Sequence, residues 1–237
     1  MAKQSVPRYA VYFAPEPNSD LDVLGTSWLG RDMDGKEPHG QALVSNVSKH
    51  RLNELTESPR RYGFHGTFKP PFELNPTMSL DALLRTARIF ACGLSPVEIP
   101  RLELAVIGKF IALTPVSQSA ALEKLSAACV RAFEAFREPL TDEQIESYRQ
   151  NKLTVHQEQM LEHWGYPYVM EEFQFHMSLT DRIDDSDERD AVFSALEKLA
   201  QPVLGKSISA RHLTVFGQSK RDEPMVAIER IPFGRSK

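Results

Sequence analysis

Two short stretches of the chain alternate strictly between apolar and polar residues, and each has a histidine on its polar side. One of them, residues 173–180, reads F-Q-F-H-M-S-L-T. Successive side chains of a β-strand point to opposite faces, so the phenylalanines, methionine and leucine share one face. His176 and Ser178 then lie together on the other face. The pattern predicts a strand that packs its apolar face on helices and presents a histidine and a hydroxyl about 7 Å apart.

A second stretch repeats this arrangement earlier in the chain. Residues 62–69 read Y-G-F-H-G-T-F-K, which places His65, Thr67 and Lys69 on one face and two phenylalanines behind them. Residues 70–71 are both proline, which cannot donate to a ladder, so the strand is expected to end there. The repeated pattern makes His65 and Thr67 candidates for chemistry. Lys69 is either a cation that contacts substrate or a solvated lysine at the end of a strand.

Apolar periodicities typical of strands and helices predict the other elements. Residues 8–14 form a first strand, whose Tyr12 either faces the substrate with the histidines or lies at the rim of the core. Thr141 and Thr154 each begin a T-x-x-Q capping box, which predicts two short helices. The remaining expected strands lie at 98–107, 109–114, 207–216 and 225–231, and the remaining helices at 80–92, 119–136 and from Ser186 or Asp187 to about residue 200.

The order of these elements contains an internal repeat. A strand with His65 is followed by a helix, a strand, Gly108 and a strand, and the same order runs from His176 past Gly217. We therefore expect an α+β fold with two pseudo-symmetric lobes around a central groove, each an antiparallel sheet with helices on its outer face. The expected single bilobal domain spans residues 1–237, with repeat units at about 62–114 and 170–231 and a helical insertion at about 139–168.

The charge of the chain disfavours one class of partner. Its 237 residues carry a formal net charge of -4, whereas proteins that grip a long nucleic acid usually have a basic excess. We expect a small substrate and no long nucleic acid. The N-terminus has no apolar signal-peptide core, and no apolar run is long enough for a membrane span. We therefore expect a cytoplasmic protein with no membrane partner.

Two histidines that face one groove suit acid–base catalysis, because imidazole titrates near neutral pH. One imidazole takes the proton of an attacking water or hydroxyl, and the other protonates the leaving oxygen. A phosphodiester fits this arrangement, since Thr67 and Ser178 can hydrogen-bond its oxygens while Lys69 adds a positive charge. The scheme requires no metal or cofactor, and the sequence has none of the usual metal-ligand clusters. A lone histidine on a strand is usually structural, so the interpretation depends on the pair.

The same motifs carry a family resemblance. H-G-T-F-K-P-P-F at 65–72 and F-H-M-S-L-T at 175–180 resemble the paired signatures of the 2H phosphoesterase superfamily, which includes bacterial RNA ligase-like cyclic phosphodiesterases. With W-G-Y-P-Y-V at 164–169, they are most similar to the branch often encoded beside phosphonate-utilisation genes. The resemblance implies a bilobal α+β fold in which His65 and His176 are catalytic. It also implies that the hydroxyl two residues after each histidine binds phosphate.

Two further stretches each allow two interpretations. The aromatic segment 164–169 either packs within the fold or stacks on substrate. The loop at 218–224, with Lys220 and Arg221, either closes over an anionic substrate or is an exposed charged hairpin.

Three functions remain open. The first is a metal-independent phosphodiesterase that acts on a small cyclic phosphodiester, either a nucleoside 2′,3′-cyclic phosphate or a ribose cyclic phosphate from phosphonate breakdown. The second is an RNA-end processing or ligase-like enzyme on the same fold, against which the negative charge counts. The third is a non-catalytic nucleotide- or RNA-binding module, which has no need of two histidines.

Overall fold

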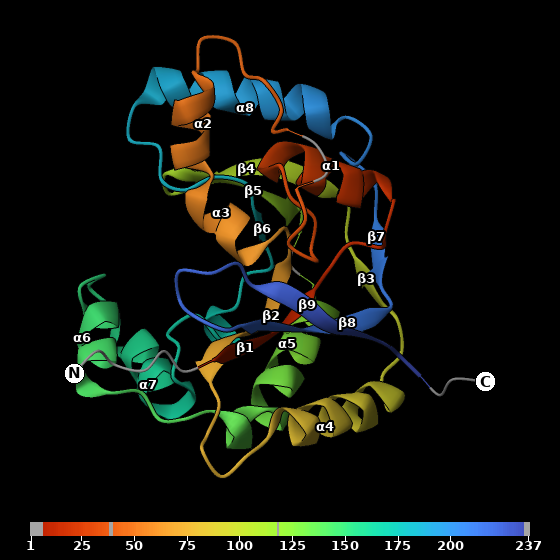
Figure 1. Ribbon diagram of the computed structural model, residues 1–237, viewed down its shortest axis with the longest axis vertical. Coiled ribbons are helices and arrows are strands. Elements are labelled where there is room, and N and C mark those ends of the chain that lie inside the picture. The colour runs from red at the N-terminus through yellow and green to blue at the C-terminus, as the bar shows by residue number, and fades with distance from the viewer. Residues whose placement is uncertain (1–6, 38–39, 118, 235–237) are drawn as a thin grey trace.

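The computed structural model describes residues 7–37, 40–117 and 119–234, which form antiparallel sheets with helices around them (Figure 1). The strands are β1 (Arg8–Phe13), β2 (Gly66–Glu73), β3 (Val97–Ile99), β4 (Leu102–Ile107), β5 (Phe110–Pro115), β6 (Met177–Ser178), β7 (Ile208–Ala210), β8 (His212–Gln218) and β9 (Val226–Pro232). The helices are α1 (Asp20–Leu29), α2 (Lys49–Leu55), α3 (Glu57–Tyr62), α4 (Leu80–Cys92), α5 (Ala120–Ala132), α6 (Asp142–Arg149), α7 (Val155–Trp164) and α8 (Ser186–Ala200). Two short 3-10 turns are Glu134–Phe136 and Met170–Glu172.

The strands form two main sheets and one small one. The larger sheet has the order β2-β1-β8-β9, the second has the order β4-β5-β6, and β3 pairs with β7. The pairings between these named strands are all antiparallel. In Figure 1, α4 and α5 lie below the larger sheet, whereas α2 and α8 lie above the second one. The predicted α+β class with antiparallel sheets and outer helices is therefore confirmed.

Each main sheet combines strands from both halves of the internal repeat. The strand after His65, β2, belongs to the sheet that contains β8 and β9 from the second half. The strand after His176, β6, pairs instead with β5 from the first half. The chain thus crosses between the sheets in each half, and the two histidine strands are edge strands of different sheets.

Helix ends follow the local capping signals closely. Thr141 and Thr154 form complete capping boxes at the starts of α6 and α7, and α7 ends at Gly165 with φ 70°. The last long helix, α8, is capped by Asp185, whose side chain accepts from the Glu188 amide, and not by the expected Ser186 or Asp187. Helix α5 ends at Ala132, short of the expected residue 136, and continues as a 3-10 turn. Among the described residues, no helix is long and apolar enough to cross a membrane.

The first histidine strand does not end at its two prolines, contrary to our expectation. Strand β2 runs from Gly66 to Glu73 and pairs with β1 along this length. It is an edge strand, so the missing N–H groups of Pro70 and Pro71 need not break a ladder. The register shifts between Tyr9 and Val11 as β1 passes the prolines. The edge position thus permits a strand that the local signal alone would terminate.

The second histidine strand is shorter than its alternation suggests. Only Met177 and Ser178 form β6, and His176 immediately precedes it. The alternation of exposure nevertheless holds, because Phe175, Met177 and Leu179 are buried in the core while His176 and Ser178 are half-buried. That core also contains Val11, Phe13, Phe68 and the inner faces of α4, α5 and α8.

Candidate active site

The first imidazole is held by the backbone turn between α3 and β2. Gly63 has φ 77°, a left-handed conformation that glycine adopts readily. Its carbonyl accepts a 2.8 Å hydrogen bond from Nδ1 of His65. Because Nδ1 carries the proton, Nε2 of the neutral ring is an acceptor, and it lies 3.2 Å from the Thr67 hydroxyl. The turn therefore selects one tautomer and directs Nε2 toward the polar face.

A tyrosine ring packs on this imidazole, and burial determines its protonation state. The ring of Tyr12 stacks on His65 with centroids 3.6 Å apart and an interplanar angle of 15°. Burial lowers the pKa of His65 from 6.5 to about 4, although its hydrogen bond to Gly63 acts in the opposite direction. The positive charges of His176 and Arg31 lower this pKa further. His65 is consequently neutral near pH 7 in the absence of a bound anion.

The second imidazole repeats the same hydrogen bond. Nδ1 of His176 donates to the carbonyl of Gln174, two residues back, over 2.8 Å. Ser178 follows two residues later, and the ring of Phe110 lies 5.8 Å from the imidazole. Burial lowers the pKa of His176. Both histidines therefore use Nδ1 for the backbone and leave Nε2 for other partners.

The two motif strands touch each other directly. A Cβ built on Gly66, next to His65, would lie 2.5 Å from the ring of Phe175, next to His176. Only glycine allows this approach without displacing the ring. The contact brings the two motif strands together, and the charge of His176 is one of the causes that lower the pKa of His65.

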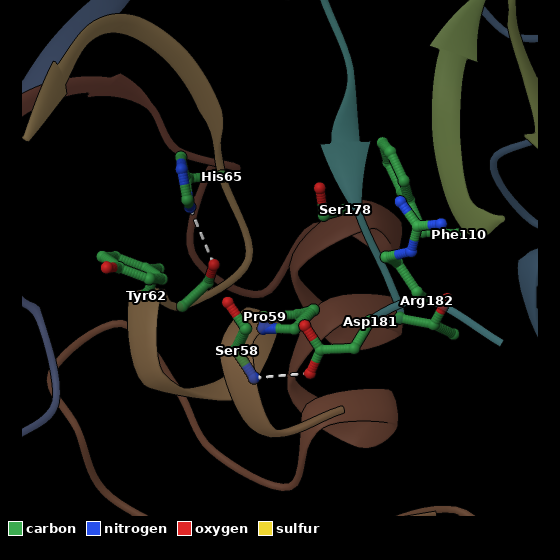
Figure 2. Close-up of a pocket in the computed structure, with 10 residues that line it drawn as sticks. Ser58, Pro59, Tyr62, His65, Phe110, Ser178, Asp181 and Arg182 are labelled. Atoms are coloured by element: carbon green, nitrogen blue, oxygen red, sulfur yellow. Dashed lines mark hydrogen bonds between the residues drawn. The ribbon is translucent and has the colours of Figure 1, made fainter. Parts of the chain in front are cut away.

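A cavity of about 220 Å³ opens beside the two strands (Figure 2). His65 and Ser178 lie on its walls, whereas His176 and Thr67 are not among the residues that line it. The other lining residues come from α3, β5 and the segment after β6: Ser58, Pro59, Tyr62, Gly63, Phe110, Thr180, Asp181 and Arg182. The cavity is large enough for a small ligand but not for a folded nucleic acid.

Lys69 does not lie at this cavity, and its expected place beside His65 is wrong. It is 1 % exposed, and its Nζ donates to Glu134 Oε2 over 2.5 Å. The cause is a shift in register between β1 and β2, where Tyr12 pairs with Thr67 but the preceding Val11 pairs with Lys69. One step along β1 therefore corresponds to two residues of β2, as in a β-bulge. The extra residue moves the Lys69 side chain to the face opposite Thr67.

The cavity has a different cation, which sequence reasoning missed. Arg182 lies at its wall, and so does Asp181, whose carboxylate accepts from the Ser58 amide at the start of α3 (Figure 2). Burial raises the pKa of Asp181. Both residues directly follow the second motif, so a search just beyond the strand would have found them. Tyr62 likewise begins the first motif stretch, whereas Ser58 had no such signal, because the start of α3 approaches the site only in the folded chain.

A buried arginine supports the turn that holds His65. Arg31 is 4 % exposed and donates to the carbonyls of Arg60, Arg61 and Met225. It thereby ties the end of α3 to the segment before β9. Burial lowers the pKa of Arg31. Its positive charge is one of the causes that lower the pKa of His65.

No metal cluster accompanies these groups within the described part of the chain, where no set of three or more His, Cys, Asp or Glu side chains could hold an ion.

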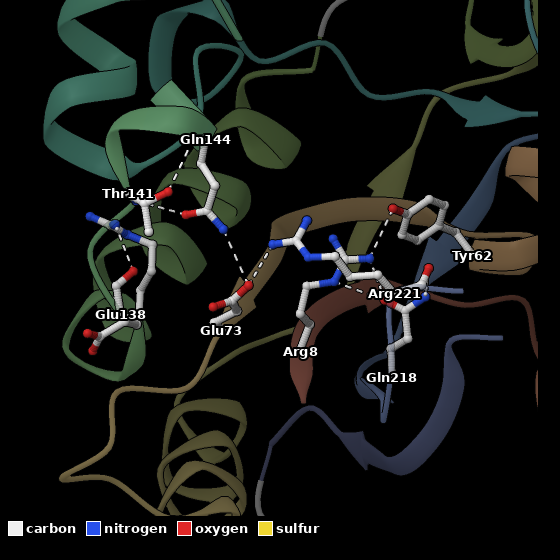
Figure 3. Close-up of polar contacts among 9 residues, drawn as sticks. Arg8, Tyr62, Glu73, Glu138, Thr141, Gln144, Gln218 and Arg221 are labelled. Atoms are coloured by element: carbon white, nitrogen blue, oxygen red, sulfur yellow. Dashed lines mark hydrogen bonds and ion pairs between the residues drawn. The ribbon is translucent and has the colours of Figure 1, made fainter. Parts of the chain in front are cut away.

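The aromatic segment 164–169 and the basic loop 218–224, which each allowed two interpretations, both contact other protein groups. Tyr166 of the aromatic segment packs against Tyr148 of α6, with ring centroids 5.7 Å apart. Arg221 of the basic loop pairs with Glu73 at the end of β2 (Figure 3).

Comparison with known proteins identifies one family model and several relatives. Residues 67–226 match the model of a family described as "Protein of unknown function (DUF1045)". A protein of Janthinobacterium sp. (strain Marseille) named "Ribose 1,5-bisphosphate phosphokinase PhnN" is 32% identical over 237 residues, which are 98% of this chain and 52% of that protein. A protein of the same name from Laribacter hongkongensis is 33% identical over 180 residues, 76% of this chain and 41% of its own. The chain thus spans about half the length of the curated relatives it matches, or less.

Similar solved structures have low sequence identity to the chain. Escherichia coli LigT complexed with 3'-AMP has a TM-score of 0.45 and 10% identity, with 97% of this chain and 99% of LigT covered. TT0787 of Thermus thermophilus has a TM-score of 0.47 and 14% identity, with 97% of this chain and all of TT0787 covered (100%).

Proposed function

The chain belongs to the DUF1045 family, and from this premise we propose that it is a phosphodiesterase in which His65 and His176 form the acid–base pair. One observation carries the proposal. Both imidazoles donate Nδ1–H to the carbonyl two residues back, over 2.8 Å in each case, so each presents Nε2 in the same way. A structural histidine has no need of a matched copy on a second, touching strand.

The proposed reaction is hydrolysis of a small cyclic phosphodiester. A water oxygen forms a bond to phosphorus and gives its proton to Nε2 of His65, the imidazole whose pKa is lowered to about 4 and which is therefore neutral beforehand. The phosphorus–oxygen bond of the ring breaks, and the leaving oxygen takes a proton from His176. The products are a phosphate monoester and a free hydroxyl group. A bound anion raises the pKa of both imidazoles, which permits His176 to be protonated in the complex.

Other polar groups near the pair suit the oxygens of a phosphate. Ser178 lines the cavity, and the Thr67 hydroxyl already lies 3.2 Å from Nε2 of His65. We assign to Arg182 the role of countercharge that we first assigned to Lys69. Tyr12 is 1 % exposed and stacks on His65, so we propose that it positions the imidazole and does not bind phosphate itself.

The relatives favour one of the two cyclic substrates. Proteins whose sequence aligns with this chain over about half their length are named ribose 1,5-bisphosphate phosphokinases. Hydrolysis of a ribose cyclic phosphate that also carries a phosphate on C5 would yield a ribose bisphosphate. A hydrolase that supplies the substrate of a kinase would be useful in the same protein as that kinase. We therefore propose a phosphorylated ribose cyclic phosphate as the substrate, ahead of a nucleoside 2′,3′-cyclic phosphate.

A panel of cyclic phosphodiesters assayed in the presence of EDTA tests this function. The wild-type protein should hydrolyse the phosphorylated ribose cyclic phosphate without added metal, and His65→Ala or His176→Ala should lower kcat by a factor of about 10²–10⁴. His50→Ala, which changes an exposed histidine of α2, is the matched control and should have no effect. Activity abolished by EDTA, or retained when both His65 and His176 are replaced, would refute the proposed chemistry.

A further inference from the structure

A second cation, Arg8, is buried near the histidine cavity but is not part of it. It begins β1 and is 9 % exposed. Its Nε and Nη2 both donate to the side-chain oxygen of Gln218, which lies opposite it on β8, and Nη2 also donates to the Tyr62 hydroxyl over 3.2 Å (Figure 3). Gln218 in turn donates to the carbonyls of Arg221 and Glu223. The guanidinium is thus held in one orientation by neutral groups.

Among the described residues, only neutral groups accept hydrogen bonds from this arginine. Within the described residues, no carboxylate forms an ion pair with Arg8. Glu73 pairs with Arg8 in the β1–β2 register, yet its carboxylate accepts from Arg221 and Gln144 instead. A buried charge is costly unless it is paired, and the Nη1 group of Arg8 donates to no described residue. A bound anion would remove this cost.

A second cavity adjoins this guanidinium. Its volume is about 60 Å³, compared with about 220 Å³ for the histidine cavity. Three arginines and two glutamates lie on its walls with uncharged residues, which are Pro71, Phe72, Pro139, Leu140, Gln144, Tyr148 and Gly165. The charged residues are Arg8, Arg137, Arg221, Glu73 and Glu138. Such a space is too small for a nucleobase but accepts a group the size of a phosphate.

One side chain connects the two cavities. Tyr62 lines the histidine cavity, and its hydroxyl accepts from Arg8 at the second cavity. A small molecule with two phosphate groups that reaches from one cavity to the other would pass beside this side chain.

We propose that Arg8, oriented by Gln218 and Tyr62, binds a second phosphate of the substrate, a monoester that does not react. The inference rests on the proposed function for the reacting group, but it concerns a separate set of residues. A planar guanidinium with a free edge binds a phosphate through paired hydrogen bonds. The site thereby distinguishes a cyclic phosphate that carries an additional phosphomonoester from one that lacks it.

Binding of ribose 5-phosphate, with ribose as the comparison, tests this site without catalysis. Calorimetry of the wild-type protein should detect ribose 5-phosphate and not ribose, and Arg8→Gln should weaken binding by about 10- to 100-fold. Gln218→Glu is nearly isosteric, retains an acceptor for Arg8 and adds a negative charge, so it should weaken binding similarly even if Arg8→Gln fails to fold. Arg88→Gln, an exposed arginine of α4 paired with Glu229, is the charge-matched control. Unchanged affinity in a folded Arg8→Gln or Gln218→Glu protein would overturn the proposal.

Kinetics with paired substrates distinguishes this site from the catalytic pair. For a ribose cyclic phosphate with a C5 phosphate, both variants should raise KM and leave kcat close to the wild-type value. For the same cyclic phosphate without the C5 phosphate, they should leave both constants unchanged. Equal losses for the two substrates would overturn the second site and point to a structural role of Arg8. If the wild-type protein hydrolyses neither substrate, the proposed function fails, while the calorimetry still decides whether Arg8 binds phosphate.

Discussion

Because the pKa of His65 is depressed, the free energy of unfolding should decrease as the pH is lowered below about 6.5. Replacing this one residue should remove that decrease. In the folded protein its pKa is about 4, whereas an unfolded histidine titrates near 6.5. Between these values the unfolded chain binds a proton at this position and the folded chain does not. The stabilising contribution is therefore present above pH 6.5 and is lost as the pH falls toward 4. His65→Gln should abolish this part of the pH dependence.

The size of the effect follows from the two pKa values. Each pH unit between them changes the free energy of unfolding by about 1.4 kcal/mol, so the loss from pH 6.5 to pH 5 is about 2 kcal/mol. The imidazole is partly buried, and screening by water lowers this to about 1–2 kcal/mol. Burial also lowers the pKa of His176, but that contribution is common to both proteins and cancels when they are compared.

Urea unfolding at pH 7.5 and pH 5, followed by the fluorescence of the fully buried Trp28, measures the difference. The wild-type protein should lose about 1–2 kcal/mol more than His65→Gln between the two pH values. His50→Gln, which replaces an exposed histidine, should behave as the wild type. Equal losses in wild type and His65→Gln would refute the reasoning, because the imidazole would then titrate alike in the folded and unfolded chains.

Further predictions concern the pair, its supports and the buried lysine. Loss of both His65 and His176 should cost less than the product of the single losses in kcat, because the two act on one transition state; strict multiplicativity would contradict this. The profile of kcat/KM against pH should be bell-shaped, and a plateau from pH 4 to pH 9 would exclude a two-group mechanism. Gly66→Ala should lower both kcat and the melting temperature, because the Phe175 ring must move; an unchanged kcat would show that this contact does not align the strands. Lys69→Met should lower the free energy of unfolding by about 1–3 kcal/mol without changing KM, and a raised KM would place it back at the substrate.

The amino-acid sequence by itself determined the features that depend on a few neighbouring residues. The two capping boxes at Thr141 and Thr154, and the stop at Gly165, are hydrogen bonds and dihedral angles within single turns of chain. The alternation around His176 likewise survives although only two residues there form a strand, because burial of the apolar side chains maintains it. These interactions are complete within a few residues, so the pattern contains the information.

Tertiary structure decided the features that depend on which segments meet. The shift in register opposite β1 moved Lys69 to the far face, although the alternation of β2 placed it beside His65. The pairing of each histidine strand with elements from the other half of the repeat also has no local signal. Arg8 and Gln218 are 210 residues apart in the chain and meet only because β1 lies between β2 and β8. Such contacts are selected by the combined packing of sheets and helices, so no single stretch of residues specifies them.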